Sequence, residues 1–358
     1  MLATQHVTTL GQSLWLDNLS RSLIRDGTLA RYIAEDGVSG VTSNPTIFHQ
    51  ALQTSPYYAD DLARLKAAEP DAERRYEALI VADVQAACDL LHPVHEASGG
   101  RDGYVSLEVA PRWAYDAPRT VAEAQRLAAA VDRRNLLIKV PGTPEGLSAF
   151  EALTTLGVNV NVTLLFSVAQ TQAVFDAYLR GLAARTRAGA DVRRSKAVAS
   201  LFLSRVDTLV DTHLTAIGTE EALALRGKAA VAMARIAYRR YRDTFHGAPF
   251  AELARQGASP QFLLWASTGV KNPAYPDLLY VEPLIGAETI NTLPDKTLAA
   301  LRDHGQPAAR LEEGAAEAAT QLDTLARLGI DMDQVGQRLQ ADGVRLFEEA
   351  YQKLLQAG

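Results

Sequence analysis

Cysteine and lysine are both scarce in this 358-residue sequence. The single cysteine, Cys88, excludes an intramolecular disulfide and is typical of a reducing compartment. Lysine occurs 7 times against 29 arginines, so few of the 36 basic side chains can lose a proton and act as a nucleophile. Each lysine can therefore be considered individually.

Long apolar runs and an excess of positive charge are absent as well. No apolar stretch approaches the roughly 18 residues that a membrane-spanning helix needs. Residues 1–11 lack the basic and apolar regions of a signal peptide. The 36 basic and 42 acidic residues give a net charge of −6, which argues against nucleic-acid binding. These absences predict a soluble, cytoplasmic protein with neither a membrane nor a nucleic acid as partner.

Signatures of cofactor and metal binding are also missing. The sequence has no Walker loop, and no G-x-G-x-x-G follows an apolar run, so a nucleotide cofactor has no support. His92 and His95 do not form a metal-ligand motif, and the other histidines are scattered. We therefore expect no metal site and no cofactor. Cys88 falls within a helical pattern, which predicts a core position.

The chain does contain a recurring unit of a short apolar run, a turn and a longer helical pattern. The apolar runs are nearly continuous, as expected for a parallel sheet that is covered on both faces. Strands are predicted at Ser13–Asp17, Val38–Ser43, Gly103–Val109, Asn135–Val140, Val158–Leu165, Lys196–Leu203, Gln261–Ser267 and Leu279–Pro283. Eight strands alternating with helices favour an α/β fold of the (β/α)8 TIM-barrel type, with a doubly wound open sheet as the alternative.

Helix signals lie between the predicted strands. An amphipathic pattern predicts a helix over Arg74–Leu91, and Glu220–Phe245 has the pattern of a long helix broken near Gly227. Helix starts are predicted at Thr120 with Glu123, at Ser167 with Gln170 and at Thr143 followed by Pro144, and a helix end is predicted at Gly157.

The C-terminal part of the chain has a different pattern. From Gln306 onward it is helical, with no further strand. We expect a catalytic barrel over residues 1–305 and a C-terminal helical extension over residues 306–358 that packs on it, which together form one structural domain.

Polar side chains stand at the ends of the predicted strands. In a (β/α)8 barrel, catalytic residues come from the C-terminal ends of several strands, which meet at one face. In chain order these ends supply Asp17, Asn44, Glu108, Lys139, Asn161, Thr163, Ser200, Ser267 and Glu282. Apolar runs that repeatedly end in a hydrogen-bonding or ionisable residue predict a ring-shaped active site.

Lys139 is the sharpest candidate, because it stands among apolar residues at the end of its strand. Desolvation lowers the pKa of a lysine, towards ~7–8 in catalytic cases, and the neutral amine can attack a carbonyl to form a Schiff base. The alternative is a lysine that reaches out of the sheet to a surface carboxylate. Lys196, at the start of its strand, faces the opposite end of the barrel and is assigned no chemistry.

Asp17 and Glu108 are candidate partners of Lys139. Schiff-base chemistry needs carboxyl groups that move protons, often through a water molecule, although either residue could instead simply neutralise the lysine. Asn44, Asn161 and Ser200 are suited to sugar hydroxyls, yet each taken alone is typical of a turn or a helix cap.

Five segments together resemble the transaldolase family, longer bacterial subclass, among the class I Schiff-base aldolases. They are Leu14–Asn18, Val41–Thr46, Ile138–Thr143, Asn161–Ser167 and Ala199–Asp207, and they occur in family order. One such segment would be weak, whereas five in register are specific. The resemblance implies a TIM barrel that acts as a transferase in the non-oxidative pentose phosphate pathway, on sugar phosphates and without a cofactor.

The resemblance also implies catalytic roles. Lys139 would capture the ketose carbonyl as a Schiff base, and Asp17 would act on the hydroxyl whose deprotonation drives retro-aldol cleavage. Glu108, through a water positioned with Thr163, would serve the formation and breakdown of the carbinolamine.

Further residues would bind the substrate. Asn44, Asn161 and Ser200 would hold the dihydroxyacetone moiety, and Arg205 would bind the sugar phosphate, for which a guanidinium is well suited. The best-known transaldolases carry a second phosphate-binding arginine after the seventh strand. The stretch Trp265–Pro273 has none, so Lys271 is the expected substitute, beside Ser267.

Two residues favour group transfer over simple aldol cleavage. Related aldolases that release free dihydroxyacetone carry a glutamine and a tyrosine in place of Glu108 and Phe202. We therefore expect transfer of a dihydroxyacetone unit from sedoheptulose 7-phosphate to glyceraldehyde 3-phosphate, giving erythrose 4-phosphate and fructose 6-phosphate.

Several alternatives stay open. A Schiff-base aldolase could release free dihydroxyacetone or use an acceptor from secondary metabolism. A barrel without catalysis could bind a partner through its helical extension, and an isomerase could use Glu108 as its base. The expected oligomeric state is a monomer or a homodimer.

Overall fold

Eight parallel strands form a closed barrel in the computed structural model, which describes residues 2–357. The strands are β1 Gln12–Leu16, β2 Val38–Thr42, β3 Tyr104–Glu108, β4 Leu136–Pro141, β5 Val160–Leu165, β6 Ala197–Phe202, β7 Phe262–Ala266 and β8 Thr289–Leu293. Neighbours pair in chain order, and β8 closes the barrel on β1. The predicted (β/α)8 fold is thereby confirmed.

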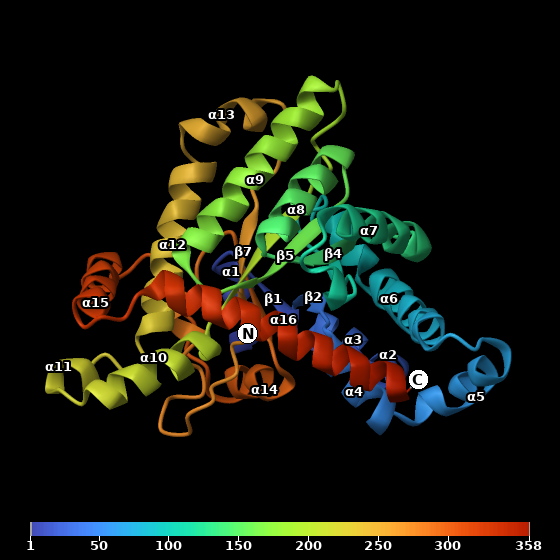
Figure 1. Ribbon diagram of the computed structural model, residues 1–358, viewed down its shortest axis with the longest axis horizontal. Coiled ribbons are helices and arrows are strands. Elements are labelled where there is room, and N and C mark those ends of the chain that lie inside the picture. The colour runs from blue at the N-terminus through green and yellow to red at the C-terminus, as the bar shows by residue number, and fades with distance from the viewer. Residues whose placement is uncertain (1, 358) are drawn as a thin grey trace.

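Helices surround the barrel (Figure 1). The α-helices are α1 Ala3–Thr9, α2 Arg21–Arg25, α3 Thr28–Arg31, α4 Pro45–Thr54, α5 Ala59–Ala68, α6 Ala72–Ala97, α7 Ala117–Val131, α8 Pro144–Leu156, α9 Val168–Arg187, α10 Ser204–Ile217, α11 Glu220–Leu223, α12 Ala229–Phe245, α13 Ala248–Arg255, α14 Asp295–His304, α15 Ala315–Arg327 and α16 Met332–Ala357. Short helical turns are η1 Tyr32–Asp36, η2 Pro56–Tyr58, η3 Pro111–Trp113 and η4 Glu282–Leu284. Over residues 2–357, none of these helices is both long enough and apolar enough to cross a bilayer.

Continuous apolar runs became strands that are buried on both faces. Every residue of β4, β5 and β6 is buried, because one face points into the barrel and the other is covered by helices. Cys88 also lies in the core, on α6, as predicted, and burial raises the pKa of its thiol to about 12.

Most of the predicted helix boundaries are confirmed. The Ser167 hydroxyl accepts a hydrogen bond from the Gln170 amide at the start of α9, and Thr143 caps α8 in the same way. Gly157 ends α8 with φ +82°, a conformation that favours glycine. The helix predicted over Glu220–Phe245 is broken between α11 and α12, at Gly227.

The predicted start of α7 is wrong. The Asp116 side chain caps this helix by accepting from the Arg119 amide, so the helix begins at Ala117. Thr120 lies inside the first turn, and its hydroxyl donates to the carbonyl of Trp113. Asp116 lies one turn before Thr120 and already accepts a hydrogen bond from a free backbone amide at the helix start, so the helix begins there.

The predicted eighth strand is also wrong. Leu279–Pro283 forms turns and the beginning of η4, and the strand is instead β8. All five residues of β8 are buried, but its alternating Thr and Asn side chains hide it from a search for continuous apolar runs. Glu282 therefore lies away from the strand ends, where it accepts from the Gln306 amide and pairs with Arg310.

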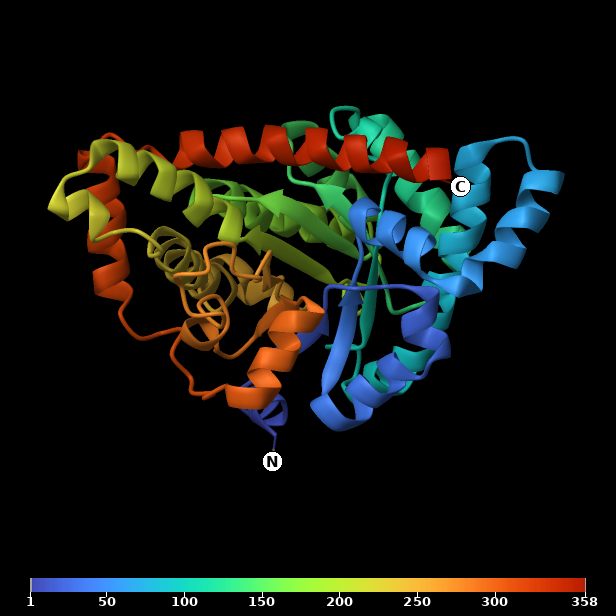
Figure 2. The ribbon, with the colours of Figure 1, turned by 90° about the horizontal axis from the view of Figure 1, so that it is seen from below.

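The last helix, α16, lies across the C-terminal ends of the strands, and the N-terminus lies on the other side of the barrel (Figure 2). The Gln340 side chain of α16 donates to the carbonyl of Gly142 at 2.8 Å and to that of Leu164 at 3.0 Å. Gly343 of α16 lies so close that a Cβ there would stand 2.9 Å from the Leu164 side chain. The helix thus contacts the ends of β4 and β5 directly.

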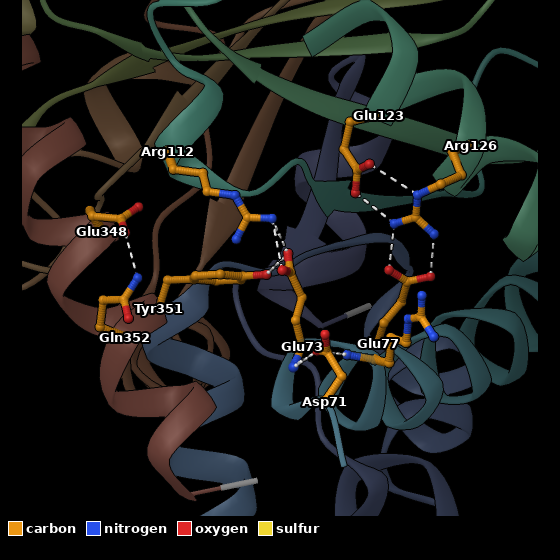
Figure 3. A network of polar contacts seen from close by, with 10 residues as sticks. Asp71, Glu73, Glu77, Arg112, Glu123, Arg126, Glu348, Tyr351 and Gln352 are labelled. Atoms are coloured by element: carbon orange, nitrogen blue, oxygen red, sulfur yellow. Dashed lines mark hydrogen bonds and ion pairs between the residues drawn. The ribbon is translucent and has the colours of Figure 1, made fainter. Parts of the chain in front are cut away.

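A polar network holds the C-terminal half of α16 in place (Figure 3). The Tyr351 hydroxyl donates to Glu73 of α6 at 2.8 Å. Arg112 of η3 donates to both carboxylate oxygens of Glu73, at 2.6 and 2.7 Å. Beside them, Arg126 of α7 joins Glu77 and Glu123. The helix over the barrel mouth is therefore tied to α6 and, through η3, to the loop that follows β3.

Candidate active site

Lys139 lies inside the mouth of the barrel, near the end of β4. Only 6% of its side chain is exposed, and its Nζ donates to the carbonyl of Ser43 at 2.8 Å. The Oε2 atom of Glu108 lies 3.6 Å from the same nitrogen, because the register of β3 and β4 places these two residues side by side. The side chain thus points into the barrel and not to a surface carboxylate.

Two carboxyl groups face this lysine with their acidity weakened. Burial raises the pKa of Asp17, against the attraction of Lys139 and a 2.8 Å hydrogen bond from the Thr42 hydroxyl. Burial also raises the pKa of Glu108, again opposed by Lys139, and the charge of Asp17 raises it further. Carboxyl groups with a raised pKa beside a buried amine are suited to taking up and returning protons near neutral pH.

Two buried oxygens at this place have no hydrogen-bond partner within residues 2–357. They are Oε2 of Glu108 and the hydroxyl of Thr163, a fully buried residue on β5. Because a buried polar atom without a hydrogen bond is costly, both oxygens are suited to bind a water or a substrate group. The contact of Glu108 Oε2 with Lys139 Nζ, at 3.6 Å, is an ion pair and leaves room for such a bond.

A cavity of about 230 Å³ opens above these groups. Nine of the eleven predicted site residues line it: Asp17, Asn44, Lys139, Thr163, Ser200, Phe202, Arg205, Ser267 and Lys271. They come from all parts of the barrel, since the ends of parallel strands converge at one face. Glu108 and Asn161 do not line this cavity.

Asn161 lies on β5, hydrogen-bonded to Ser200, which lines the cavity. It is fully buried, accepts from the Ser200 hydroxyl at 2.6 Å and donates to the Ser106 hydroxyl at 3.2 Å. Its amide oxygen orients Ser200, and its NH2 group has a second hydrogen that these bonds leave unused. Glu108 stands behind Lys139, where Tyr351 of α16 lines a small adjoining cavity with it.

Asn44 and Ser267 have structural tasks as well as a place at the cavity. The Oδ1 atom of Asn44 caps α4 by accepting from the Ile47 amide at 3.0 Å, which leaves its NH2 group available. Ser267 has φ +54°, and its hydroxyl lies 2.8 Å from that of Ser204 at the start of α10. Both residues fix the backbone where a strand turns into the cavity wall.

Arg205 brings an uncompensated positive charge to the cavity. It lies in the first turn of α10, and no ion pair or hydrogen bond engages its guanidinium within the described part of the chain. Burial lowers its pKa, and only the more distant Asp342 of α16 opposes this. Its Cζ lies 6.0 Å from the centre of the Phe202 ring. Lys271, in contrast, is exposed on the loop after β7.

Several residues of the site were not predicted from the sequence. Thr42 and Thr292 form a 2.6 Å hydrogen bond next to Asp17, and Phe347 of α16 reaches the cavity wall. Thr42 stands two residues before Asn44 and could have been found from that spacing. Thr292 belongs to the strand that was missed, and nothing in the sequence near Phe347 relates it to the barrel.

In the part of the chain that the structure describes, no group of three or more His, Cys, Asp or Glu side chains is arranged to hold a metal ion.

Comparison with known proteins places the chain among characterised families. Residues 14–358 match the family described as Transaldolase/Fructose-6-phosphate aldolase. A protein named Transaldolase from Thiobacillus denitrificans is 70% identical over 355 residues, or 99% of each chain. Another Transaldolase, from Neisseria meningitidis serogroup A, is 51% identical over 99% of each chain. Transaldolase 1 of Streptomyces coelicolor is 46% identical over 99% of this chain and 93% of its own.

Proposed function

This chain belongs to the transaldolase/fructose-6-phosphate aldolase family, and we propose that it transfers a dihydroxyacetone unit between sugar phosphates through a Schiff base on Lys139. Sedoheptulose 7-phosphate is the donor and glyceraldehyde 3-phosphate the acceptor, and the products are erythrose 4-phosphate and fructose 6-phosphate. The observation that carries this proposal is a buried lysine amine beside two carboxyl groups, in a cavity that also contains an unpaired arginine.

Catalysis begins when the Lys139 amine attacks the ketose carbonyl carbon and forms a carbinolamine. The carbinolamine loses its hydroxyl as water, and the proton for this step comes from Glu108 through a water held by the Thr163 hydroxyl. The two unpartnered oxygens of Glu108 and Thr163 support this assignment, because a bridging water would satisfy both. The resulting protonated imine withdraws electrons from the adjacent carbon.

Carbon–carbon cleavage follows at Asp17. Its carboxylate takes the proton of the hydroxyl two carbons beyond the imine, that hydroxyl becomes the aldehyde of the departing aldose, and the bonding electron pair moves into an enamine on Lys139. The raised pKa of Asp17 supports this role, because a more basic carboxylate removes the proton more readily. The enamine then attacks the acceptor aldehyde, and the same steps run in reverse.

Substrate binding divides between the depth and the rim of the cavity. The NH2 group of Asn44 and the Ser200 hydroxyl, oriented by Asn161, hold the hydroxyls of the dihydroxyacetone unit. Arg205 binds the phosphate, since a guanidinium that makes no ion pair or hydrogen bond within the described residues can donate two parallel hydrogen bonds to one phosphate group. Lys271 adds a second cation, and Phe202 and Ser267 complete the walls.

Borohydride reduction tests this proposal directly. In the presence of fructose 6-phosphate, reduction should convert the imine into a stable secondary amine on a peptide that contains Lys139. The variant Lys139→Ala should give no adduct and no transfer. An adduct elsewhere, or activity in the variant, would refute the Schiff-base assignment.

The rival activities give different results in the same assay. An aldolase would release free dihydroxyacetone without an added aldose, whereas a transaldolase holds the enamine until an acceptor arrives. An isomerase would exchange a substrate proton with no trapped imine, and a barrel that only binds a partner would give no reaction. Phe202 and Glu108 in the site support transfer over release.

We also propose a setting for this activity. The protein works in the cytoplasm as a monomer or homodimer, with no metal or organic cofactor, because the protonated imine itself withdraws electrons. Residues 1–305 and 306–358 form one structural domain, supported by the contacts of α16 with β4, β5 and α6. Analytical ultracentrifugation tests the oligomeric state. Calorimetric unfolding tests the single domain, for which we expect one transition.

A further inference from the structure

A second and larger cavity lies at the opposite, N-terminal end of the barrel. Its volume is about 480 Å³, against about 230 Å³ for the candidate active site. It is lined by segments that lead into β3 to β7, including residues 99–100, 133–134, 157–159, 193–196 and 259. Because the two cavities are at opposite ends of the strands, an occupant here does not touch the reacting carbons.

Positive charge dominates the lining of this cavity. Five cationic side chains contribute, from Arg133, Arg134, Arg193, Arg194 and Lys196, and Glu96 is the one carboxylate among the described lining residues. Two of the arginines are already engaged, Arg133 by Asp89 and Arg193 by Asp191. The guanidinium groups of Arg134 and Arg194 have no ion pair or hydrogen bond within residues 2–357.

Two buried groups in the floor of the cavity also lack the partners that they need. Lys196 is 4% exposed, and its Nζ donates to the Arg101 carbonyl at 3.0 Å and lies 4.0 Å from the centre of the Phe262 ring. No carboxylate of the described chain lies within ion-pair distance of it. The hydroxyl of Ser195, a residue only 7% exposed, has no hydrogen-bond partner within residues 2–357.

A bound anion would give Lys196 a counter-charge and the Ser195 hydroxyl an acceptor, and the exposed Arg134 and Arg194 line the same cavity. Burial lowers the pKa of Lys196 to about 8, with Asp102 opposing, which reflects a cation without a close counter-charge. A buried hydroxyl without a partner costs free energy that a bound acceptor oxygen would recover. Phosphate offers several acceptor oxygens and two negative charges, which arginine and lysine recognise well.

We propose that this cavity binds the phosphate group of a small soluble metabolite, free or esterified, through Arg134, Arg194, Ser195 and Lys196. A cavity of this volume has room for a phosphate and an attached organic part. The net charge of −6 disfavours a nucleic acid, which would need an extended basic surface. The proposal is independent of the transaldolase assignment, because none of these residues lines the active-site cavity.

Calorimetric titration with sn-glycerol 3-phosphate tests the site. This ligand has no carbonyl and cannot form a Schiff base, and the Arg205→Ala background removes the phosphate-binding arginine of the active site. We expect saturable binding to that variant, weakened about 10-fold or more when Arg134→Ala and Arg194→Ala are added. The matched control adds Arg226→Ala and Arg240→Ala, which removes the same charge from exposed positions outside the cavity.

The outcomes separate clearly. No binding to the Arg205→Ala protein, or equal weakening by both double substitutions, would overturn the proposal, and circular dichroism checks that every variant is folded. Glycerol should not bind. If inorganic phosphate binds as tightly as the ester, the site recognises the phosphate alone; tighter binding of the ester shows that the organic part is also contacted. The Lys139→Ala protein should bind as the parent does, whatever the fate of the proposed reaction.

Discussion

Two lysines lie inside the barrel, near its opposite ends, and differ in almost everything except burial. Lys139 is 5% exposed and Lys196 is 4% exposed. Lys139 stands 3.6 Å from a carboxylate at the mouth, whereas Lys196 donates to a backbone carbonyl and faces two aromatic rings at the floor. Burial alone therefore does not distinguish Lys139, the proposed Schiff-base lysine, from Lys196, which belongs to the proposed anion site.

What separates the two ends is the chemistry around each amine. At the mouth, the raised pKa values of Asp17 and Glu108 suit proton transfer, and Arg205 lines the same cavity as Asp17 without an ion-pair partner in residues 2–357. At the floor, five cationic side chains and one carboxylate, Glu96, are among the described lining residues, and no carboxylate of residues 2–357 lies within ion-pair distance of the lysine. The mouth is thus equipped for bond making and the floor for binding.

The largest expected effect on activity comes from replacing one of the two buried lysines, Lys139 or Lys196, by a neutral residue. Lys139→Ala should lower transaldolase activity by about 10⁴-fold or more, because the nucleophile is lost. Lys196→Gln should retain activity within about 10-fold, since it removes no reacting group. Steady-state kinetics measure both. Comparable losses of activity in the two variants would contradict the assignment of catalysis to Lys139 and not to Lys196.

The carboxylate beside Lys139 gives the next effect. Glu108→Gln should lower kcat by about 10²- to 10³-fold and slow borohydride trapping in parallel, because a general acid–base group is removed from carbinolamine formation. Glu96→Gln, at the other end of the barrel, is the matched control and should leave kcat unchanged. Normal trapping in Glu108→Gln would reassign this residue to a later step.

Arginines at the two ends should differ in their effect on KM. Arg205→Ala should raise KM for fructose 6-phosphate about 10- to 100-fold, because a charge-assisted hydrogen bond to phosphate is lost. Lys271→Ala, at an exposed position, should raise it by about threefold or less. Arg194→Ala should leave KM as it is. A change in KM with Arg194→Ala would mean that the two cavities are coupled.

Gln340 of α16 should act on the mouth without touching substrate. Leu164, next to Thr163, has φ +60°, and Gln340 holds its carbonyl in that conformation. Gln340→Ala should lower kcat about 10-fold with KM little changed, because Thr163 is then positioned less firmly. Gln337→Ala, exposed on the same helix, is the control. An effect on KM alone would assign Gln340 to substrate binding.

The smallest effect concerns stability and pH. Because the pKa of Asp17 is raised on folding, its carboxylate destabilises the folded protein above the unfolded-state pKa of about 3.9, and the penalty disappears when it is protonated. Asp17→Asn should therefore raise the unfolding midpoint by about 2 °C at pH 7, with a difference that vanishes towards pH 4, while activity is lost.

Asp191, near the floor, provides the opposite case for the same experiment. Hydrogen bonds from Arg193 lower the pKa of Asp191 to about 2, so its carboxylate stabilises the fold above the unfolded-state pKa. Asp191→Asn should not raise the midpoint at pH 7. A rise in both variants would point to net charge as the cause and not to the local setting of each carboxyl group.

Much of the barrel was predictable because burial on two faces leaves a plain mark in the sequence. Seven strands were predicted within three residues of their observed ends. The eighth strand, β8, was missed because several of its buried residues are Thr and Asn. Their side chains make hydrogen bonds inside the protein; Asn291, for example, donates to the Tyr280 carbonyl in the preceding loop. Polar residues whose hydrogen bonds are made far along the chain carry no local signal of burial.

Part of the candidate site was predictable in the same way. Residues at strand ends, such as Lys139 and Asp17, follow from strand prediction, because parallel strands bring their ends together. Asn161 was predicted to hold the substrate, and the structure adds that its side chain accepts a hydrogen bond from Ser200 on the neighbouring strand. Phe347 and Gln340 could not be predicted, since a helix lying nearly 200 residues after β4 reaches the mouth only through tertiary packing.

The sequence by itself determined the order of strands and helices, the family, and which lysine stands at the end of a strand, because periodicity and short motifs are local properties. Only the tertiary structure decided that Glu108 and Asp17 both face Lys139, that α16 covers the mouth, and that Arg134, Arg194 and Lys196 share one cavity. These facts depend on distances in space between segments that are far apart in the sequence. Closure of the barrel sets those distances.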